Sequence, residues 1–275
     1  MNTIFLKRAL ELYLFEDAFF SDLTTDAIAT TRKARATIRA KESLVLPGTI
    51  FIEPLFDLFG KPYSLELLKN DGSQVEKGEK IATIEAEEKV LLTAERTCLN
   101  ILQRLSGIAT KTSRIAGLIE QFKTKIADTR KTTPGFRFFE KYAVKVGGGI
   151  NHRMGLFDAV LIKDNHIKIA GSIKKAIEMV KKGSSFTAKV EVECSNTGMV
   201  EEAIENNADI IMLDNMGITE IKKIMERFKG RALFEASGNI DENNIVEVAK
   251  TGVEYISMGA LTHHACWVDI NMKLE

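Results

Sequence analysis

The second half of the chain alternates short apolar runs with amphipathic segments, and this alternation constrains the fold more than any other feature. The apolar runs end near residues 127, 162, 192, 213, 234 and 257. Segments with apolar residues at helical spacing lie between most of them, at 172–180, 197–206, 218–228 and 243–250. Because parallel strands are joined by crossover helices, this alternation predicts parallel βα units.

Polar or small residues follow each predicted strand, which favours an α/β barrel. A barrel gathers its functional residues at the carboxyl ends of several strands. An open doubly wound sheet is the alternative, but it uses one switch point and commonly a GxGxxG turn. No such turn follows a predicted strand here. Since six strands are fewer than the eight of a complete barrel, we expect an incomplete barrel.

The first half has a different pattern and predicts a separate α+β domain. Residues 3–20 have helical spacing, and 36–40, 43–46 and 80–84 alternate as strands do. A short helix is expected at 53–59, a turn-rich edge at 71–78, and a long helix from 94 toward 122. We therefore expect an N-terminal α/β sandwich domain at 1–105 and the barrel at 106–275, with a C-terminal tail that can pack back on the first domain.

Composition limits the classes of partner. Lys plus Arg and Asp plus Glu both number 38, so no net charge attracts nucleic acid or an anionic membrane. No apolar run approaches about 18 residues, and the N-terminus lacks the apolar core of a signal peptide. The 3 cysteines have no CxxC spacing, which favours reduced thiols. We expect a cytoplasmic protein that binds neither nucleic acid nor membrane.

Cationic side chains follow the predicted strands in loops that are also rich in Gly and Pro. They are Arg130, Lys131, His152, Arg153, Lys163 and His166. Arg offers a planar fork for carboxylate or phosphate, and Lys offers a compact point charge. The alternative is a solvated charged surface, but Gly and Pro suit close backbone approach. The cluster predicts a pocket for a polyanionic small molecule.

Acidic side chains follow two of the same strands. Residues 189–194 alternate strictly, so Glu191 and Glu193 share one face. Two acids there are costly to bury without a cation or metal. Asp214 ends the next strand, and with Glu193 it could hold Mg²⁺ through water. Salt bridges to Lys163 or Lys189 are the alternative for these acids, and the two interpretations are compatible, because a lysine in the pocket can neutralise the acids before substrate arrives.

Small residues end the last two strands, as EASGN at 235–239 and SMGA at 257–260. Paired on adjacent strands, such turns can hold a phosphate, although either one alone indicates only a turn. A zinc site is not expected, because the histidines lack HExxH or Cys/His spacing. Cys194 could be a nucleophile, but a buried structural thiol is the favoured interpretation.

The motifs resemble the quinolinate phosphoribosyltransferase family, also called nicotinate-nucleotide pyrophosphorylase (carboxylating). They follow the family's order over nearly the whole chain. They are SDLTT at 21–25, AERTCLN at 94–100, DTRKTTPG at 128–135, GGGINHRMGL at 147–156, LIKDNH at 161–166, EVE at 191–193, MLDN at 212–215, EASG at 235–238 and GALTH at 259–263.

The resemblance implies an N-terminal sandwich domain, an incomplete barrel, and a homodimer in which one subunit's first domain caps the partner's active site. A hexamer of such dimers is left open. The implied reaction is Mg²⁺-dependent transfer of phosphoribosyl from phosphoribosyl pyrophosphate to quinolinate, yielding nicotinate mononucleotide, pyrophosphate and CO₂ in NAD biosynthesis. Rivals are a nicotinate-type phosphoribosyltransferase, a family branch linked to molybdenum transport, and a non-catalytic anion-binding module.

The resemblance also implies roles for individual residues. Lys131, Lys163, Glu193 and Asp214 would be catalytic, with the two acids also holding Mg²⁺. Arg96 would reach the neighbouring active site. Substrates would contact Arg130, Lys131, Thr132, His152, Arg153, Lys163, Glu193 and Asp214, and the 5′-phosphate would contact Ser237, Gly238, Asn239, Met258, Gly259 and Ala260. Asn239 stands where the family commonly has Gly, and His264 where Ser is frequent.

Overall fold

The computed structural model describes residues 3–275 and divides them into two compact units. The first unit contains the chain up to Lys111 together with Ala265–Glu275, and the second contains Thr112–His264. The last segment belongs to the first unit because β12 (Ile270–Leu274) pairs with β1 (Lys33–Ala40). Among the described residues, no helix combines the length and the apolar character needed to cross a lipid bilayer.

The first unit is built around an antiparallel sheet, as the sequence predicts. Its strand order is β12-β1-β5-β3, with β3 at Ser64–Leu67 and β5 at Lys80–Glu87. A two-stranded sheet joins β2 (Leu44–Val45) to β4 (Gln74–Val75). The helices are α1 (Thr3–Asp17), α2 (Leu23–Ile28), α3 (Ile52–Phe56) and the start of α4 (Glu88–Leu118), with 3₁₀ turns at Thr49–Phe51 and Asp57–Phe59.

Strand β1 is buried on both faces, which the predicted alternation does not anticipate. Ala36 and Ile38 are inaccessible to solvent, and Thr37 between them is only 1% exposed. The Thr37 hydroxyl donates to Glu275 Oε1 at 2.7 Å, so this inward polar group is satisfied. The C-terminal segment therefore supplies both the neighbouring strand and a partner for a buried hydroxyl.

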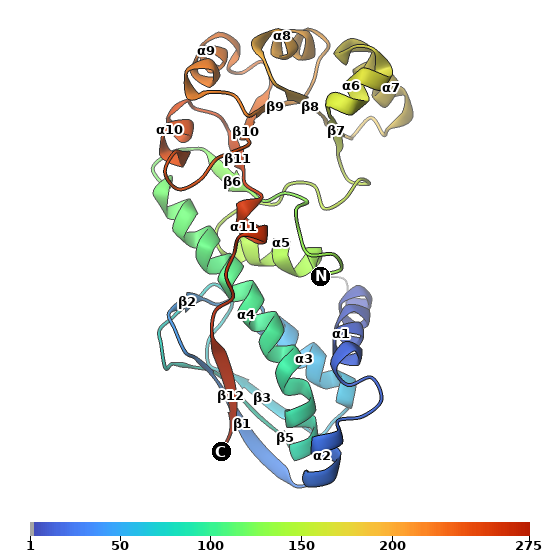
Figure 1. Ribbon diagram of the computed structural model, residues 1–275, viewed down its shortest axis with the longest axis vertical. Helices are drawn as coiled ribbons and strands as arrows, with labels where there is room; N and C mark the ends of the chain where they lie inside the picture. The colour runs from blue at the N-terminus through green and yellow to red at the C-terminus, as the bar shows by residue number, and fades with distance from the viewer. Residues whose placement is uncertain (1–2) are drawn as a thin grey trace. The chain divides into compact units, whose positions relative to one another are not determined.

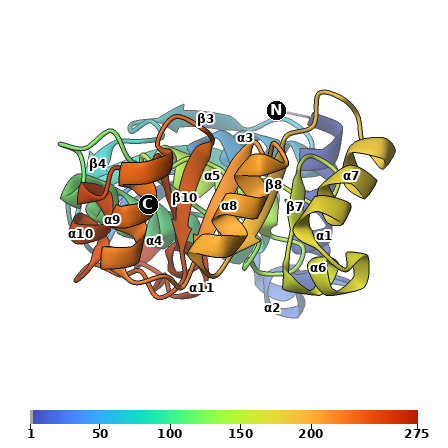
Figure 2. The ribbon, with the colours of Figure 1, turned by 90° about the horizontal axis from the view of Figure 1, so that it is seen from above.

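The second unit is a curved parallel sheet with helices outside it. Its strand order is β6-β11-β10-β9-β8-β7. The strands are β6 (Lys125–Ala127), β7 (Val160–Ile162), β8 (Val190–Cys194), β9 (Ile210–Asp214), β10 (Leu233–Ser237) and β11 (Tyr255–Ser257). The intervening helices are α6 (Asp164–Ala170), α7 (Ile173–Gly183), α8 (Thr197–Glu205), α9 (Ile218–Phe228) and α10 (Ile245–Lys250). Figures 1 and 2 show α7, α8 and α9 along the outer side of the strands.

The strand order confirms an incomplete barrel and excludes the doubly wound alternative. Strands β7 to β11 follow one another in sequence order, and β6 then pairs with β11, so the order never reverses. Between the edge strands β6 and β7, Ile150 forms a single parallel bridge to Ala127. The sheet therefore curves back toward its start but stays open on one side.

Three helices of the second unit were not predicted from the sequence: α5 (Arg137–Val146), α6 and α11 (Ala260–His263). His166, expected in a loop, lies in α6, where its Nδ1 accepts from Lys163 N at 2.9 Å. The long helix α4 begins at Glu88, six residues before the predicted start at Ala94. Strands β3 and β12 were also missed.

Candidate active site

A cavity of about 950 Å³ lies at the carboxyl ends of the strands in the second unit. The structure brings the following predicted residues to its wall: Arg130, Lys131, His152, Arg153, Lys163, Glu193, Asp214, Ser237, Gly238, Asn239, Met258, Gly259 and Ala260. His263, His264 and Asn215 also line it. The register explains the convergence, because Asp214, Ser237 and Ser257 are direct neighbours across β9, β10 and β11.

Two predicted residues lie elsewhere. Thr132 does not line the cavity; its hydroxyl accepts from Arg137 Nε at 2.9 Å and so supports the loop that carries Arg130 and Lys131. Arg96 is exposed on α4 in the first unit.

Hydrogen bonds to backbone carbonyl groups fix the loops on the cationic side of the cavity. Thr262 Oγ1 donates to Lys131 O at 2.7 Å, and Arg153 Nη1 donates to Ala159 O at 3.0 Å. Burial and the charge of Arg130 lower the pKa of Arg153 from its ordinary value. The Nε of Arg130 is buried without a hydrogen-bond partner among the described residues. Two neighbouring guanidinium groups with spare donors provide a site for a carboxylate.

The acidic side contains Glu193 and Asp214. Lys163 Nζ lies 2.5 Å from Glu193 Oε2, so the salt bridge considered from the sequence is present for this acid. Asn215 Nδ2 donates to Asp214 Oδ2 at 2.9 Å. Carboxylate oxygens on one cavity wall are the donor type that Mg²⁺ uses, and it commonly keeps several waters. These two acids therefore fit the predicted ion.

The glycine-rich turn after β10 is tied to the end of β9. Gly238 has φ +91°, and a Cβ there would lie 2.3 Å from Asn215 Oδ1. Asn239 has φ +51°, a left-handed conformation that Asn tolerates better than most residues. Its Nδ2 donates to Asn215 Oδ1 at 2.9 Å. Asn239, where the resemblance implies Gly, is thus compatible with the backbone and adds a hydrogen bond.

The turn at 237–239 is not a helix N-terminus. Helix α10 begins at Ile245, beyond a further loop, so the exposed N–H groups at 237–239 belong to the turn itself. The second small-residue turn, at Met258–Ala260, does lead directly into α11, which has only 4 residues. A Cβ on Gly259 would meet Lys131 Cδ at 2.8 Å, so glycine leaves space for that lysine.

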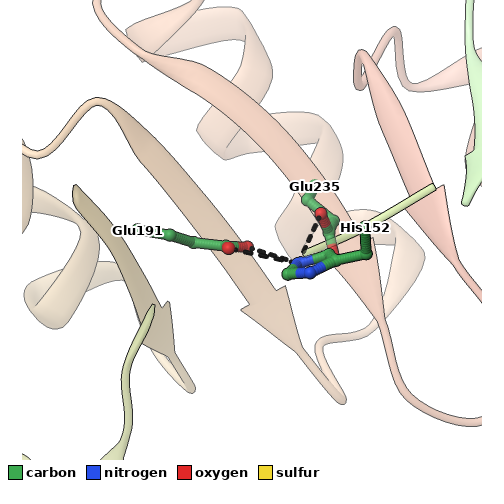
Figure 3. A group of neighbouring side chains, drawn as sticks. All are labelled: His152, Glu191 and Glu235. Carbon is green, nitrogen blue, oxygen red and sulfur yellow. Dashed lines mark hydrogen bonds and ion pairs between the residues drawn. The ribbon is translucent and has the colours of Figure 1, made fainter. Parts of the chain in front are cut away.

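Beneath the cavity, His152 contacts two buried carboxylates from β8 and β10 (Figure 3). His152 Nε2 lies 3.1 Å from Glu191 Oε2 and 3.6 Å from Glu235 Oε2. Glu191 and Glu235 are 3% and 4% exposed. Burial and the charge of Glu191 raise the pKa of Glu235 to about 7. Glu193 thus has a cationic partner of the kind the sequence predicts, Lys163, whereas the partner of Glu191 is the His152 ring.

The hydrogen bonds of the ring argue against a metal ion in this group, although its ligand atoms lie within 4.8 Å of one another. Arg153 N donates to His152 Nδ1 at 2.8 Å, so Nδ1 carries a lone pair. A neutral ring then holds its proton on Nε2, the atom that faces Glu191 and Glu235. A protonated nitrogen cannot coordinate a metal, so the group is a hydrogen-bonded cluster that fixes the ring.

Three charged side chains on one face of α5 support the cavity and were missed by sequence reasoning. Glu140, which is fully buried, accepts from Thr133 N at 3.1 Å and from its hydroxyl at 2.9 Å. Arg137 donates to Met154 O at 3.2 Å, and Lys141 forms an ion pair with Asp128. Positions 137, 140 and 141 follow the i, i+3, i+4 spacing, which would have signalled a shared face had the helix been recognised.

Both halves of the chain match one family of domains. Residues 22–106 match the family described as "Quinolinate phosphoribosyl transferase, N-terminal domain", and residues 108–273 match its "C-terminal domain".

Full-length relatives agree with that match. The chain is 40% identical to a protein of Bacillus subtilis named probable nicotinate-nucleotide pyrophosphorylase [carboxylating], over 100% of this chain and 95% of the relative. A Methanocaldococcus jannaschii protein of the same name is 44% identical over 98% and 95%. The solved nicotinate-nucleotide pyrophosphorylase of Francisella tularensis superposes with a TM-score of 0.94 at 41% identity, covering 100% of this chain and 98% of that one. The chain therefore belongs to the quinolinate phosphoribosyltransferase family, the decarboxylating phosphoribosyltransferases of NAD biosynthesis.

Proposed function

We infer that the chain transfers the phosphoribosyl group of phosphoribosyl pyrophosphate to the ring nitrogen of quinolinate, with loss of one carboxylate as CO₂. The observation that carries this inference is one cavity whose wall combines four cationic side chains (Arg130, Lys131, Arg153 and Lys163) with the acids Glu193 and Asp214, in a member of the family. Nicotinate mononucleotide and pyrophosphate are the other products.

The cations compensate two polyanionic substrates. Quinolinate has two adjacent carboxylates, and the spare guanidinium donors of Arg130 and Arg153 match their planar geometry. Lys131 and Lys163 present point charges toward phosphate groups. Without such compensation, the two anions would repel each other as they approach.

The acids suit the sugar-transfer step. As pyrophosphate departs, positive charge develops on the ribose C1, and Glu193 and Asp214 can stabilise it from the same wall. We assign these two residues to Mg²⁺ as well, held through water or substrate; when bound, the ion stabilises charge on the departing pyrophosphate. Lys163, paired with Glu193, can turn toward the same leaving group.

The two small-residue turns are assigned to the 5′-phosphate. Ser237–Asn239 and Met258–Ala260 line the cavity on adjacent strands, where backbone N–H groups can meet phosphate oxygens. This placement anchors the sugar at the end opposite the reacting carbon. Holding both substrates in one orientation supplies much of the rate enhancement, without a covalent enzyme intermediate.

Decarboxylation follows from the chemistry of the product. Once its nitrogen is bonded to ribose, the ring is a pyridinium that can accept the electron pair left at C2 when the C2–CO₂ bond breaks. A proton then replaces the lost carboxylate. The ring is its own electron sink, so this step needs no organic cofactor.

We further propose that the protein is a cytoplasmic homodimer. Arg96 of one subunit would reach the active site of the partner. Arg96 is exposed on α4, outside the cavity of its own second unit. An Arg96→Ala homodimer and a Lys163→Met homodimer should each lose most activity. Mixed dimers of the two variants should recover part of it, because one of their two sites is intact. Verified mixed dimers with no recovered activity would refute a shared site.

The experiment that tests the function measures CO₂ and pyrophosphate from the purified protein, given phosphoribosyl pyrophosphate, Mg²⁺ and either quinolinate or nicotinate. Both products should appear with quinolinate alone. Pyrophosphate released with nicotinate and without CO₂ would keep the transferase class but overturn the substrate. No release with either acid would favour the anion-binding alternative.

A further inference from the structure

Residues 151–159 cross the open side of the curved sheet without belonging to a strand. Before them Ile150 bridges Ala127, and after them β7 begins at Val160. His152 and Arg153, which both line the cavity, lie in this crossing segment. Because ladder hydrogen bonds do not fix the backbone here, other groups must satisfy it and hold it in place.

A buried ion pair binds the backbone of this segment and holds it in place. Asp128 follows β6, Lys141 lies on α5, and both side chains are 0% exposed. Asp128 Oδ1 pairs with Lys141 Nζ and also accepts from His152 N at 2.9 Å. Lys141 Nζ donates to His152 O at 2.9 Å. The pair therefore binds both the N–H and the C=O of His152, the two groups that a neighbouring strand would bind.

Asn151 connects the crossing segment to both members of the pair. Its Nδ2 donates to Asp128 Oδ2 at 2.6 Å and to Lys141 O at 2.8 Å. The carboxylate of Asp128 thus accepts from the segment through both oxygens. Asn151 and His152 are held together, directly before Arg153 in the chain.

Stability alone gives a weak reason for such a pair. Removing two charges from water is costly, and apolar side chains of similar volume often replace a buried pair without loss of stability. Burial indeed raises the pKa of Asp128 and lowers that of Lys141, and each partner's charge opposes the effect on the other. An apolar pair, however, could bind neither the N–H nor the C=O of His152.

We propose that Asp128 and Lys141 are positioning residues that replace the missing strand and set where the His152 ring and the Arg153 guanidinium meet quinolinate. The proposal rests on the proposed function, since it takes quinolinate as the ligand of these two residues. The phosphate turns are held differently, through the Asn215–Asn239 hydrogen bond and the strand register. Loss of the pair should therefore affect one substrate much more than the other.

The test is the double substitution Asp128→Asn with Lys141→Met, which removes both charges so that neither is left buried alone. We expect a folded protein whose KM for quinolinate rises at least about tenfold, because small misplacements of binding groups are costly. The KM for phosphoribosyl pyrophosphate should stay within about twofold. The matched control is Glu247→Gln with Lys250→Met, an ion pair on α10 whose side chains are 54% and 55% exposed.

Asn151→Ala is a second variant that leaves the ion pair intact. It removes one connection, and the KM for quinolinate should rise about threefold with the other KM unchanged. If the double variant does not fold, Asn151→Ala tests the proposal instead, and an unchanged KM for quinolinate in that variant overturns it. Equal increases in both KM values in a folded double variant would overturn it as well.

Failure of the proposed function has a separate signature. Equilibrium dialysis of quinolinate against the wild type and both variants reports binding without turnover. Weaker quinolinate binding by the variants supports the positioning role even if the wild type releases no CO₂. Equal, measurable binding by all three proteins overturns it, whatever the reaction catalysed, whereas no binding by the wild type itself is the failure of the proposed function.

Discussion

Replacing Glu235 with Gln should stabilise the protein at alkaline pH. Glu235 is 4% exposed, lies near Glu191, and has a pKa raised from 4.5 to about 7. Between those two pH values the folded state binds a proton that the unfolded state has released. Stability therefore falls as pH rises through this window and levels off above about pH 7. Gln has the same shape but cannot ionise, so the variant does not lose stability as pH rises through this window.

The size of the effect follows from the pKa difference. A pKa rise from 4.5 to about 7 lowers the free energy of unfolding of the wild type at pH 8 by about 3 kcal/mol. The hydrogen bond that the Gln amide offers His152 differs from that of a carboxylate, so we expect a net gain of about 1–3 kcal/mol at pH 8. At pH 4.5 or below both side chains are neutral, and the two proteins should agree within about 1 kcal/mol.

Urea unfolding followed by circular dichroism at several pH values between 4.5 and 8 measures this difference. The control is the variant Glu247→Gln, because Glu247 is an exposed acid of α10. The difference in unfolding free energy between this variant and the wild type should not change with pH. A Glu235→Gln protein that is less stable than the wild type at pH 8 would refute the reasoning. So would a difference that stays constant across the range, because the buried charge would then not be its cause.

Two further predictions concern the phosphate turn and the thiols. Gly238→Ala should raise the KM for phosphoribosyl pyrophosphate at least about tenfold, because its Cβ would displace Asn215 beside Asp214. Gly171→Ala controls for backbone strain, because Gly171 has the same φ of +91° but a Cβ there would meet no atom within 4 Å. Equal KM values for phosphoribosyl pyrophosphate in the two variants would contradict the effect of the clash at Gly238. Burial raises the pKa of both Cys98 and Cys194 to about 12, whereas Cys266 is exposed. A thiol reagent at pH 8 should therefore modify one cysteine in the native protein and all 3 after denaturation, and rapid loss of the Cys194 thiol would show that it is not inert.

The parts of the fold that the sequence predicted are those with a local signal. Apolar periodicity identified the βα units of the second unit, and the residues at the strand ends identified most of the cavity wall. Parallel strands place their carboxyl ends at one edge, so knowing the strands was enough to bring Lys163, Glu193 and Asp214 together. The turn residues Gly238 and Asn239 followed for the same reason.

The parts that were missed depend on partners far apart in the chain. Helix α5 is one of them, because its Glu140 and Lys141 are fully buried, although charged residues normally indicate a surface. Strand β12 is another, since its pairing with β1 joins residues more than 200 positions apart. Neither pairing leaves a periodic pattern in the sequence.

The sequence by itself thus determined the class of fold, the order along the chain of the parallel strands of the second unit, and the chemical types of side chain at their ends. Only the tertiary structure decided how those side chains are held: His152 by Glu191 and Glu235, and its backbone by Asp128 and Lys141. The physical reason is that periodicity is set by the few residues of a single helix or strand. The pairing of a buried charge, in contrast, depends on which distant groups the folded chain brings within hydrogen-bond distance.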